Sequence, residues 1–265
     1  LIAAIHLWSS RFVEAEELSR RALTNFRQIG DKFGVVQALA PRMRALVALG
    51  RTHEAERGIE ESLAMSESFG NLSFPMMAAA GTAVHLGLGD RALSISELAL
   101  DRSLAMGADG SESRITLALA LCQVGRADEA LAVLDVVESV TPYMLSVRAL
   151  ARAITGDPSG SIDDADQVAA DAGSSYLDRV IAGTSAGAAA MQLGERDDSV
   201  ARFDDASSTA RAAGDVVARE LVGLTRSVVL HEPSHQEAGH LGSGWRSVAA
   251  SLAALVVDRP GEPVA

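Results

Sequence analysis

Two short motifs in the sequence combine residue types that could carry out hydrolysis. Residues His231-Glu-Pro-Ser-His235 match the His-Glu-x-x-His pattern, in which two histidines on one helix face bind zinc and the glutamate acts as a general base. His240 adds a third candidate ligand. Pro233 lies inside the motif, where it would remove a helical hydrogen bond and clash with the preceding turn. We therefore expect an exposed polar turn, and assign no metal site to His231, Glu232 and His235.

The second motif, Gly183-Thr-Ser185-Ala-Gly187, matches the Gly-x-Ser-x-Gly pattern of serine hydrolases. That pattern works only where the serine lies on a strained turn between a strand and a helix. Many neighbouring residues are alanine, which favours a tightly packed helix instead. We therefore assign no catalytic residue. A hydrolase or metalloenzyme that uses Ser185 or the histidine motif is the alternative function.

Composition and charge exclude several classes of partner. The chain has 265 residues, and 35 acidic against 23 basic residues give a formal net charge of −12. Nucleic-acid binding needs a basic surface, so this balance argues against it. Aromatic residues make up only 4% of the chain, which leaves few platforms for stacking bases. Because Cys122 is the only cysteine, no intrachain disulfide can form, and we expect a buried, inert thiol and a reducing, cytoplasmic setting.

The start of the chain indicates a piece of a larger protein. Its apolar stretches predict no membrane-spanning helix in this piece. The chain begins with Leu1 rather than Met, and no charged segment followed by an apolar one opens it as a signal peptide would. The longest window without charged residues, 68–89, contains Asn71, Pro75, His85 and several glycines. We therefore expect no membrane association.

One pattern recurs along the chain: a turn residue, a short polar stretch, and a small residue that opens an amphipathic helix. The copies start at residues 10, 50, 89, 125, 156, 194 and 233. Gly50-Arg-Thr-His-Glu-Ala55 and Gly125-Arg-Ala-Asp-Glu-Ala130 are the clearest of them. Consecutive copies start 31 to 40 residues apart. A period of this length predicts stacked helical hairpins.

The helix before each turn supports the same interpretation. In a tight helical hairpin, small side chains about twelve residues apart bring the two helices together. The small residues after the turns are Ala15, Ala55, Ser94, Ala130, Ser161 and Ser199, and the residues twelve positions earlier are Ala3, Met43, Thr82, Ala118, Ala149 and Gly187. Only Met43 departs from the small type, so we expect close helix contacts at these positions.

These features resemble tetratricopeptide repeats, over residues 1–257. The long period is similar to that of the C-terminal arms of bacterial signal-transduction ATPases, arms that also occur in actinobacterial transcriptional regulators and cyclase-linked proteins. The resemblance implies an all-α fold, a right-handed superhelical solenoid of about seven antiparallel helix pairs. Residues 1–257 would form a single domain, with 215–257 as a degenerate capping pair and 258–265 as a flexible tail.

The resemblance also implies a binding groove, because in this family the first helix of each pair lines the concave face. The positions that would face it are Gln37, Arg44, Met76, Glu112, Ile115, Thr184 and Met191. A mostly apolar concavity with a few polar anchors suits a small effector or an apolar peptide side chain. Alternatively, these residues pack between neighbouring repeats. Arg44 discriminates best, because a charged side chain is rarely buried without a partner.

The function that follows is that of a non-catalytic scaffold, the sensor or regulatory arm of a larger bacterial signalling or transcription-regulatory protein. The expected partner is a protein, a peptide or a small effector, and an intramolecular contact with an upstream catalytic or nucleotide-switching domain is a further option. No cofactor is expected. A competing surface is the acidic cluster of the second half, formed by Asp163, Asp164, Asp166, Asp171, Asp197, Asp198, Asp204 and Asp205. Such a face would suit a basic partner.

Overall fold

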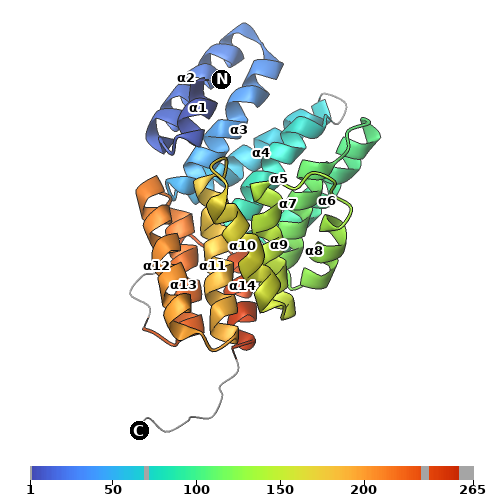
Figure 1. The fold of residues 1–265 in the computed structure, drawn as a ribbon. Coiled ribbons are helices and arrows are strands. Elements are labelled where there is room, and N and C mark those ends of the chain that lie inside the picture. Colours follow the sequence, from blue (N-terminus) through green and yellow to red (C-terminus); the bar gives the residue numbers. More distant parts are fainter. Residues whose placement is uncertain (1, 69–71, 234–238, 257–265) are drawn as a thin grey trace, which may run out of the picture.

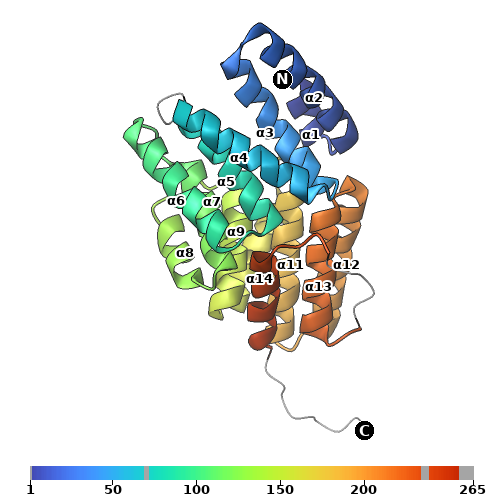
Figure 2. The same cartoon turned by 180° about the vertical axis from the view of Figure 1, so that it is seen from behind.

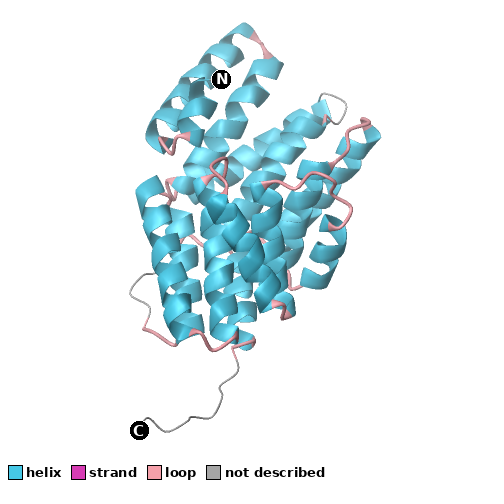
Figure 3. Ribbon diagram, in the orientation of Figure 1, coloured by secondary structure: helices cyan, strands magenta, loops and turns pink. Residues whose placement is uncertain are grey.

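The computed structural model describes residues 2–68, 72–233 and 239–256 (Figure 1). Within these ranges it contains fourteen α-helices and no strand, so the expected all-α class is confirmed (Figure 3). The helices are α1 (Ile2–Trp8), α2 (Phe12–Ile29), α3 (Lys32–Ala48), α4 (Thr52–Ser68), α5 (Ser73–Leu86), α6 (Asp90–Ala105), α7 (Ser111–Gln123), α8 (Ala127–Leu134), α9 (Pro142–Thr155), α10 (Pro158–Ala170), α11 (Tyr176–Gln192), α12 (Arg196–Ala213), α13 (Val216–Leu230) and α14 (Ser243–Ala254).

The helices stack in chain order as seven pairs that form an α-solenoid. Each helix contacts the next one along the chain, and the first helices of neighbouring pairs also contact each other from α3 to α13. These first helices therefore form a continuous inner layer. Burial follows this order: α7 is buried on nearly every side, from Ile115 to Gln123, whereas α4 buries one stripe formed by Ala55, Gly58, Ile59, Ser62 and Ser66. A stripe at this spacing is typical of an outer amphipathic helix.

The turns between the two helices of a pair lie where the repeat predicts them, with one correction. Glycines 50, 125, 156 and 194 all have a positive φ, which glycine adopts without steric cost. In the third pair, however, the helix-ending glycine is Gly87, with φ of 77°, rather than Gly89. The small contact residue accordingly shifts by two positions, so Ala92 is fully buried and the predicted Ser94 is exposed.

The short spacing between the turns at Gly125 and Gly156 is absorbed mainly by one helix. The spacing of 31 residues between these two turns predicts shorter helices in the pair around Gly156 or a local distortion there. Instead, α9 and α10 have 14 and 13 residues, whereas the preceding helix α8 has only 8. The solenoid therefore shortens the second helix of the fourth pair and keeps the inner layer continuous.

The predicted close approach between Gly187 of α11 and Ser199 of α12 is confirmed. Ser199 Oγ donates a hydrogen bond of 2.7 Å to the carbonyl oxygen of Gly187, and a Cβ at position 187 would lie 3.0 Å from the ring of Phe203. We expect Gly187→Leu to lower the free energy of unfolding by about 1–3 kcal/mol through overpacking. Urea unfolding followed by circular dichroism measures this. An unchanged midpoint would show that the helices separate at this contact without loss of stability.

The seventh pair, predicted as a degenerate cap over residues 215–257, packs differently from the six pairs before it. Helix α14 packs against α13 and also reaches the inner helices α7, α9 and α11, over which it lies in Figure 2. Backbone hydrogen bonds from Gly242 to Leu86 and from Gly244 to Gly87, of 3.0 and 2.8 Å, fasten its start to the end of α5. Trp245 is buried in this contact, and the large apolar area of its side chain stabilises the packing of α14 against the inner helices. The expected tail, 258–265, lies outside the described residues.

Among the described residues, no helix combines the length and the apolar character that crossing a bilayer would demand.

Candidate functional site

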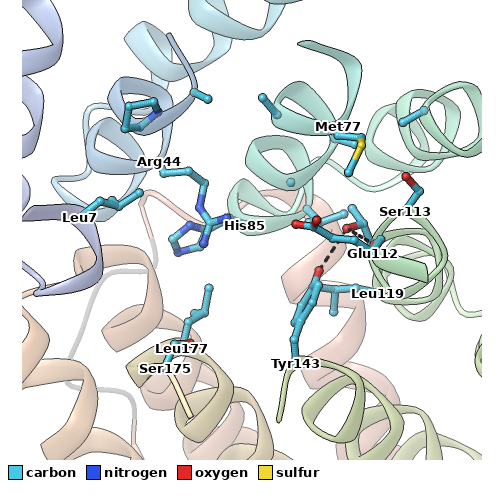
Figure 4. A pocket seen from close by; sticks show the side chains of 18 of the residues that line it. Leu7, Arg44, Met77, His85, Glu112, Ser113, Leu119, Tyr143, Ser175 and Leu177 are labelled. Atoms are coloured by element: carbon cyan, nitrogen blue, oxygen red, sulfur yellow. Dashed lines mark hydrogen bonds between the residues drawn. The ribbon is translucent and has the colours of Figure 1, made fainter. Parts of the chain in front are cut away.

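The inner layer of helices encloses a cavity of about 650 Å³ (Figure 4). Its walls come from the first helices α1, α3, α5, α7, α9 and α11, with Trp245 of α14 completing them. The apolar part of the lining includes Leu7, Trp8, Phe74, Met77, Val84, Leu119, Leu177 and Ile181. A volume of this size lies within the range of sites that hold small molecules, which is roughly 300–1,000 Å³.

Arg44 of α3 is the positive group of this cavity. Its side chain is half-buried, and its Nε is inaccessible and makes no hydrogen bond. In the described part of the chain, no carboxylate forms an ion pair with Arg44 and no other group accepts a hydrogen bond from it. The guanidinium therefore enters an apolar cavity with its donors unused by the protein.

Space for the guanidinium comes from a glycine on the neighbouring helix. Gly81 lies within α5, and a Cβ built there would meet only Arg44 Nη1, at 3.8 Å. A glycine inside a helix is less favourable than alanine by about 1 kcal/mol, so its presence here has a stability cost. What the glycine provides is open volume next to the arginine.

The opposite wall carries the other polar groups of the cavity. Glu112 of α7 is exposed, and its carboxylate forms no ion pair with a described residue; in Figure 4 it extends into the cavity from the side opposite Arg44. Tyr143 of α9 has its hydroxyl 3.4 Å from Thr116 Oγ1. Burial raises the pKa of Tyr143 to about 12, so this phenol stays protonated and remains a hydrogen-bond donor.

Below Arg44, three side chains from distant parts of the chain form a buried hydrogen-bonded network. His85 Nε2 lies 3.0 Å from Asp215 Oδ2, and Tyr176 donates its hydroxyl proton to the same oxygen at 2.8 Å. Asp215 Oδ1 accepts the backbone N–H of Ala218 at 2.8 Å and so caps α13. Trp245 Nε1 donates to the carbonyl oxygen of His85 at 2.8 Å. The network therefore joins α5, α11, α13 and α14.

The charge state of Asp215 follows from these contacts. Burial by itself would raise the pKa of Asp215, but His85 and the three hydrogen bonds to the carboxylate outweigh burial and leave this pKa below its ordinary value. Because an ionised carboxylate only accepts hydrogen bonds, His85 Nε2 carries a proton. The second ring nitrogen, Nδ1, is buried and has no hydrogen-bond partner among the described residues.

The structure brings together three of the seven residues that the sequence places in the groove. Gln37, Arg44 and Glu112 line the cavity. The other four do not line it: Met76 and Ile115 are buried in the helix packing, Thr184 Oγ1 donates to the Val180 carbonyl oxygen at 2.6 Å, and Met191 packs against the core. For these four, the alternative of packing between helices describes their position.

Neither hydrolase motif has the geometry that its chemistry needs. Helix α13 ends at Leu230, and residues 231–233 are not helical, so His231 cannot share a helix face with a second ligand; His235 lies outside the described residues. Glu232 is within 2.9 Å of Arg226 Nε. Ser185 lies in the middle of α11, fully buried, and donates to the Ile181 carbonyl oxygen at 2.8 Å. A strand-to-helix turn is absent there.

Cys122 and the acidic cluster both have structural explanations. Burial raises the pKa of the Cys122 thiol to about 12, which makes it a poor nucleophile. Within the acidic cluster, Asp164 is buried between Arg148 and Arg152, and three further aspartates are paired with arginines, namely Asp166, Asp198 and Asp204. Much of the acidic charge is therefore compensated inside the chain.

Comparison with known proteins adds one finding. No family model matches the chain, and no curated protein sequence matches it. Among solved structures, the chain is similar to a Rap protein in complex with Competence and Sporulation Factor, at 13% sequence identity and a TM-score of 0.50; the alignment covers 95% of this chain and 87% of that chain. Identity this low bears on the fold alone. Together with the stacked helix pairs, the likeness identifies the fold as a tetratricopeptide-like α-solenoid.

Proposed function

We propose that this chain is a regulatory binding module that holds a small effector or a short peptide in the cavity between its first helices. One observation carries the proposal: Arg44, a cation without a described partner, enters a cavity of about 650 Å³ whose walls are mostly apolar. A buried or half-buried charge that serves stability alone is normally paired. An unpaired arginine that faces a mostly apolar cavity is better explained by a ligand.

The fold supports this class of function. Solenoids of stacked helix pairs build extended concave surfaces, and here the cavity is formed by the helices that face inward. The Rap protein with a similar fold is complexed with Competence and Sporulation Factor. By analogy, and with the resemblance of the repeat to regulatory arms, the chain would act as the sensor arm of a larger bacterial regulator in the cytoplasm.

A ligand screen against a blocked cavity tests the proposal. Short peptides and metabolite-sized compounds are screened by thermal shift against the wild-type chain and against Gly81→Leu. A Cβ at position 81 would meet only Arg44 Nη1, and Gly81 lines the cavity, so we expect the leucine side chain to fill space that a ligand would use. A ligand present at about 100 times its Kd stabilises the native state by about 2.7 kcal/mol, which corresponds to roughly 5 °C or more in Tm.

We expect ligands that raise the Tm of the wild type and leave that of Gly81→Leu unchanged. The unliganded variant should itself unfold at a similar or higher temperature, because leucine is a better helix former than glycine. If every stabilising compound shifts both proteins equally, the cavity is not the binding site and the proposal fails.

A further inference from the structure

Some charged groups around the cavity make hydrogen bonds or ion pairs with other residues of the protein, and others do not. Asp215, which contacts His85 of the cavity lining, accepts hydrogen bonds from His85, Tyr176 and the Ala218 N–H. Asp178 Oδ2 accepts the backbone N–H of Ser175 at 2.9 Å. Neither carboxylate pairs with Arg44, although Asp178 lines the same cavity and Asp215 contacts His85 of its lining. The charged group on this side of the cavity that lacks an ion-pair partner among the described residues is therefore the guanidinium of Arg44.

Arg44 can present its outer nitrogens to a ligand. Gly81 and His85 lie one helical turn apart on α5, and Arg44 Nη1 lies 3.8 Å from where a Cβ of residue 81 would be. The guanidinium therefore sits against the face of α5 that lines the cavity. Its planar fork of N–H donors matches the two oxygens of a carboxylate.

We propose, building on the binding function above, that the ligand is an apolar molecule that ends in a single carboxylate, and that this carboxylate pairs with Arg44. The apolar part would lie along Met77 and Leu119, which Figure 4 shows on the wall across from Arg44. Two sources share this chemistry: an alkyl carboxylate, and the free C-terminus of a short apolar peptide.

A single negative charge fits better than a multiply charged group such as a phosphate ester. The only unmet cation of the described cavity lining is Arg44, while Glu112 and Asp178 also line the cavity and Asp215 contacts His85 of the lining. The chain as a whole carries a net charge of −12. These carboxylates would repel a dianion more strongly than a single carboxylate, and one guanidinium can neutralise only one negative charge of the ligand.

Calorimetric titration with matched acids and amides tests the proposal. The probes are octanoate against octanamide, and the tripeptide Leu-Leu-Leu with a free against an amidated C-terminus. We expect at least one acid to bind the wild type about 10- to 100-fold more tightly than its amide, the usual range for a hydrogen-bonded charge pair. The series in which the preference appears identifies the source.

The variant Arg44→Gln should abolish the preference for the acid, while Arg57→Gln should retain it. Arg57 is a suitable control because its side chain is 72% exposed and lies on α4, away from the cavity lining. Circular dichroism of Arg44→Gln verifies that it folds; if it does not, the ratio of acid to amide affinity in the wild type alone decides.

Equal affinity for acid and amide in both series would overturn the inference, and so would failure of both acids to bind. A preference that survives in Arg44→Gln would do the same. In each case, ligands from the screen that Gly81→Leu excludes would still uphold the binding function itself. The two proposals therefore fail on different measurements.

Discussion

Replacing Asp215 by alanine should lower the free energy of unfolding by about 3–5 kcal/mol, because it removes the acceptor that two buried side chains share and a helix cap together. Asp215 is fully buried, and its carboxylate accepts hydrogen bonds from His85, Tyr176 and the Ala218 N–H. Alanine would leave the two side-chain donors without an acceptor in the interior. Urea unfolding followed by far-ultraviolet circular dichroism measures the loss.

The matched control is Asp31→Ala. Asp31 also follows a glycine with a positive φ, and its carboxylate accepts the Gly34 N–H at 2.9 Å to cap α3. Asp31 is only partly buried and has no histidine partner, so the substitution should lower the free energy of unfolding only by the contribution of a helix cap, about 1 kcal/mol. Similar losses in the two variants would show that the network around Asp215 adds nothing beyond capping.

The pH dependence of Asp215→Asn separates the charge from the cap, since asparagine also caps helices well. The pKa of Asp215 is lowered in the folded protein, so its charge contributes stability above the pKa of an unfolded aspartate, about 3.9. That contribution is lost as the pH falls through the lower folded value. We therefore expect the wild type to exceed Asp215→Asn in stability at pH 7 and the difference to shrink below about pH 4. A constant difference would mean that the carboxylate is not ionised.

The sequence was sufficient for the helix pairs because each is set by local rules. A glycine with positive φ ends a helix, an aspartate after it caps the next, and an apolar stripe faces inward; Gly214 and Asp215 show all of this within a few residues. The sequence predicts the third turn two residues late because glycine occurs at both 87 and 89, and only the structure shows that the helix ends at Gly87 and that Ala92 is the buried small residue.

The groove was harder to predict, because its lining depends on the rotation of each inner helix. Neighbouring residues of a helix point about 100° apart. Met77 lines the cavity whereas the predicted Met76 is buried behind it, and Thr116 lines it whereas Ile115 does not. A fixed offset from the small contact residue therefore identifies the helix correctly and can miss the face by one position.

The network below Arg44 had no signal in the sequence. His85 and Asp215 are 130 residues apart, and the hydrogen bond from Trp245 to His85 spans 160 residues. No sequence motif links positions so distant. A single histidine in an apolar segment indicates a buried side chain but does not indicate which residue it contacts. Only the folded arrangement of α5, α11, α13 and α14 brings these residues together.

Replacing Trp245 by alanine should lower the free energy of unfolding by about 3–5 kcal/mol, the usual cost of deleting a large buried aromatic side chain. Trp245 is 2% exposed, lines the cavity and donates its indole N–H to the His85 carbonyl oxygen. Gly87 marks how closely it packs, because a Cβ on this glycine would lie 2.4 Å from the indole ring. The exposed Trp8, at 77%, is the control, and Trp8→Ala should change stability by less than about 0.5 kcal/mol.

Coupling between the two large effects tests whether α14 and the buried network act as one unit. Trp245 and Asp215 both hydrogen-bond to His85, one through its backbone and the other through its ring. Residues that share a partner show interaction free energies of about 0.5–3 kcal/mol in a double-mutant cycle. We expect the Asp215→Ala and Trp245→Ala double variant to lose less stability than the sum of the single losses, because either substitution alone already loosens His85. Strict additivity would mean that α14 is held by its apolar contacts alone, and that the base of the cavity is independent of the C-terminal helix.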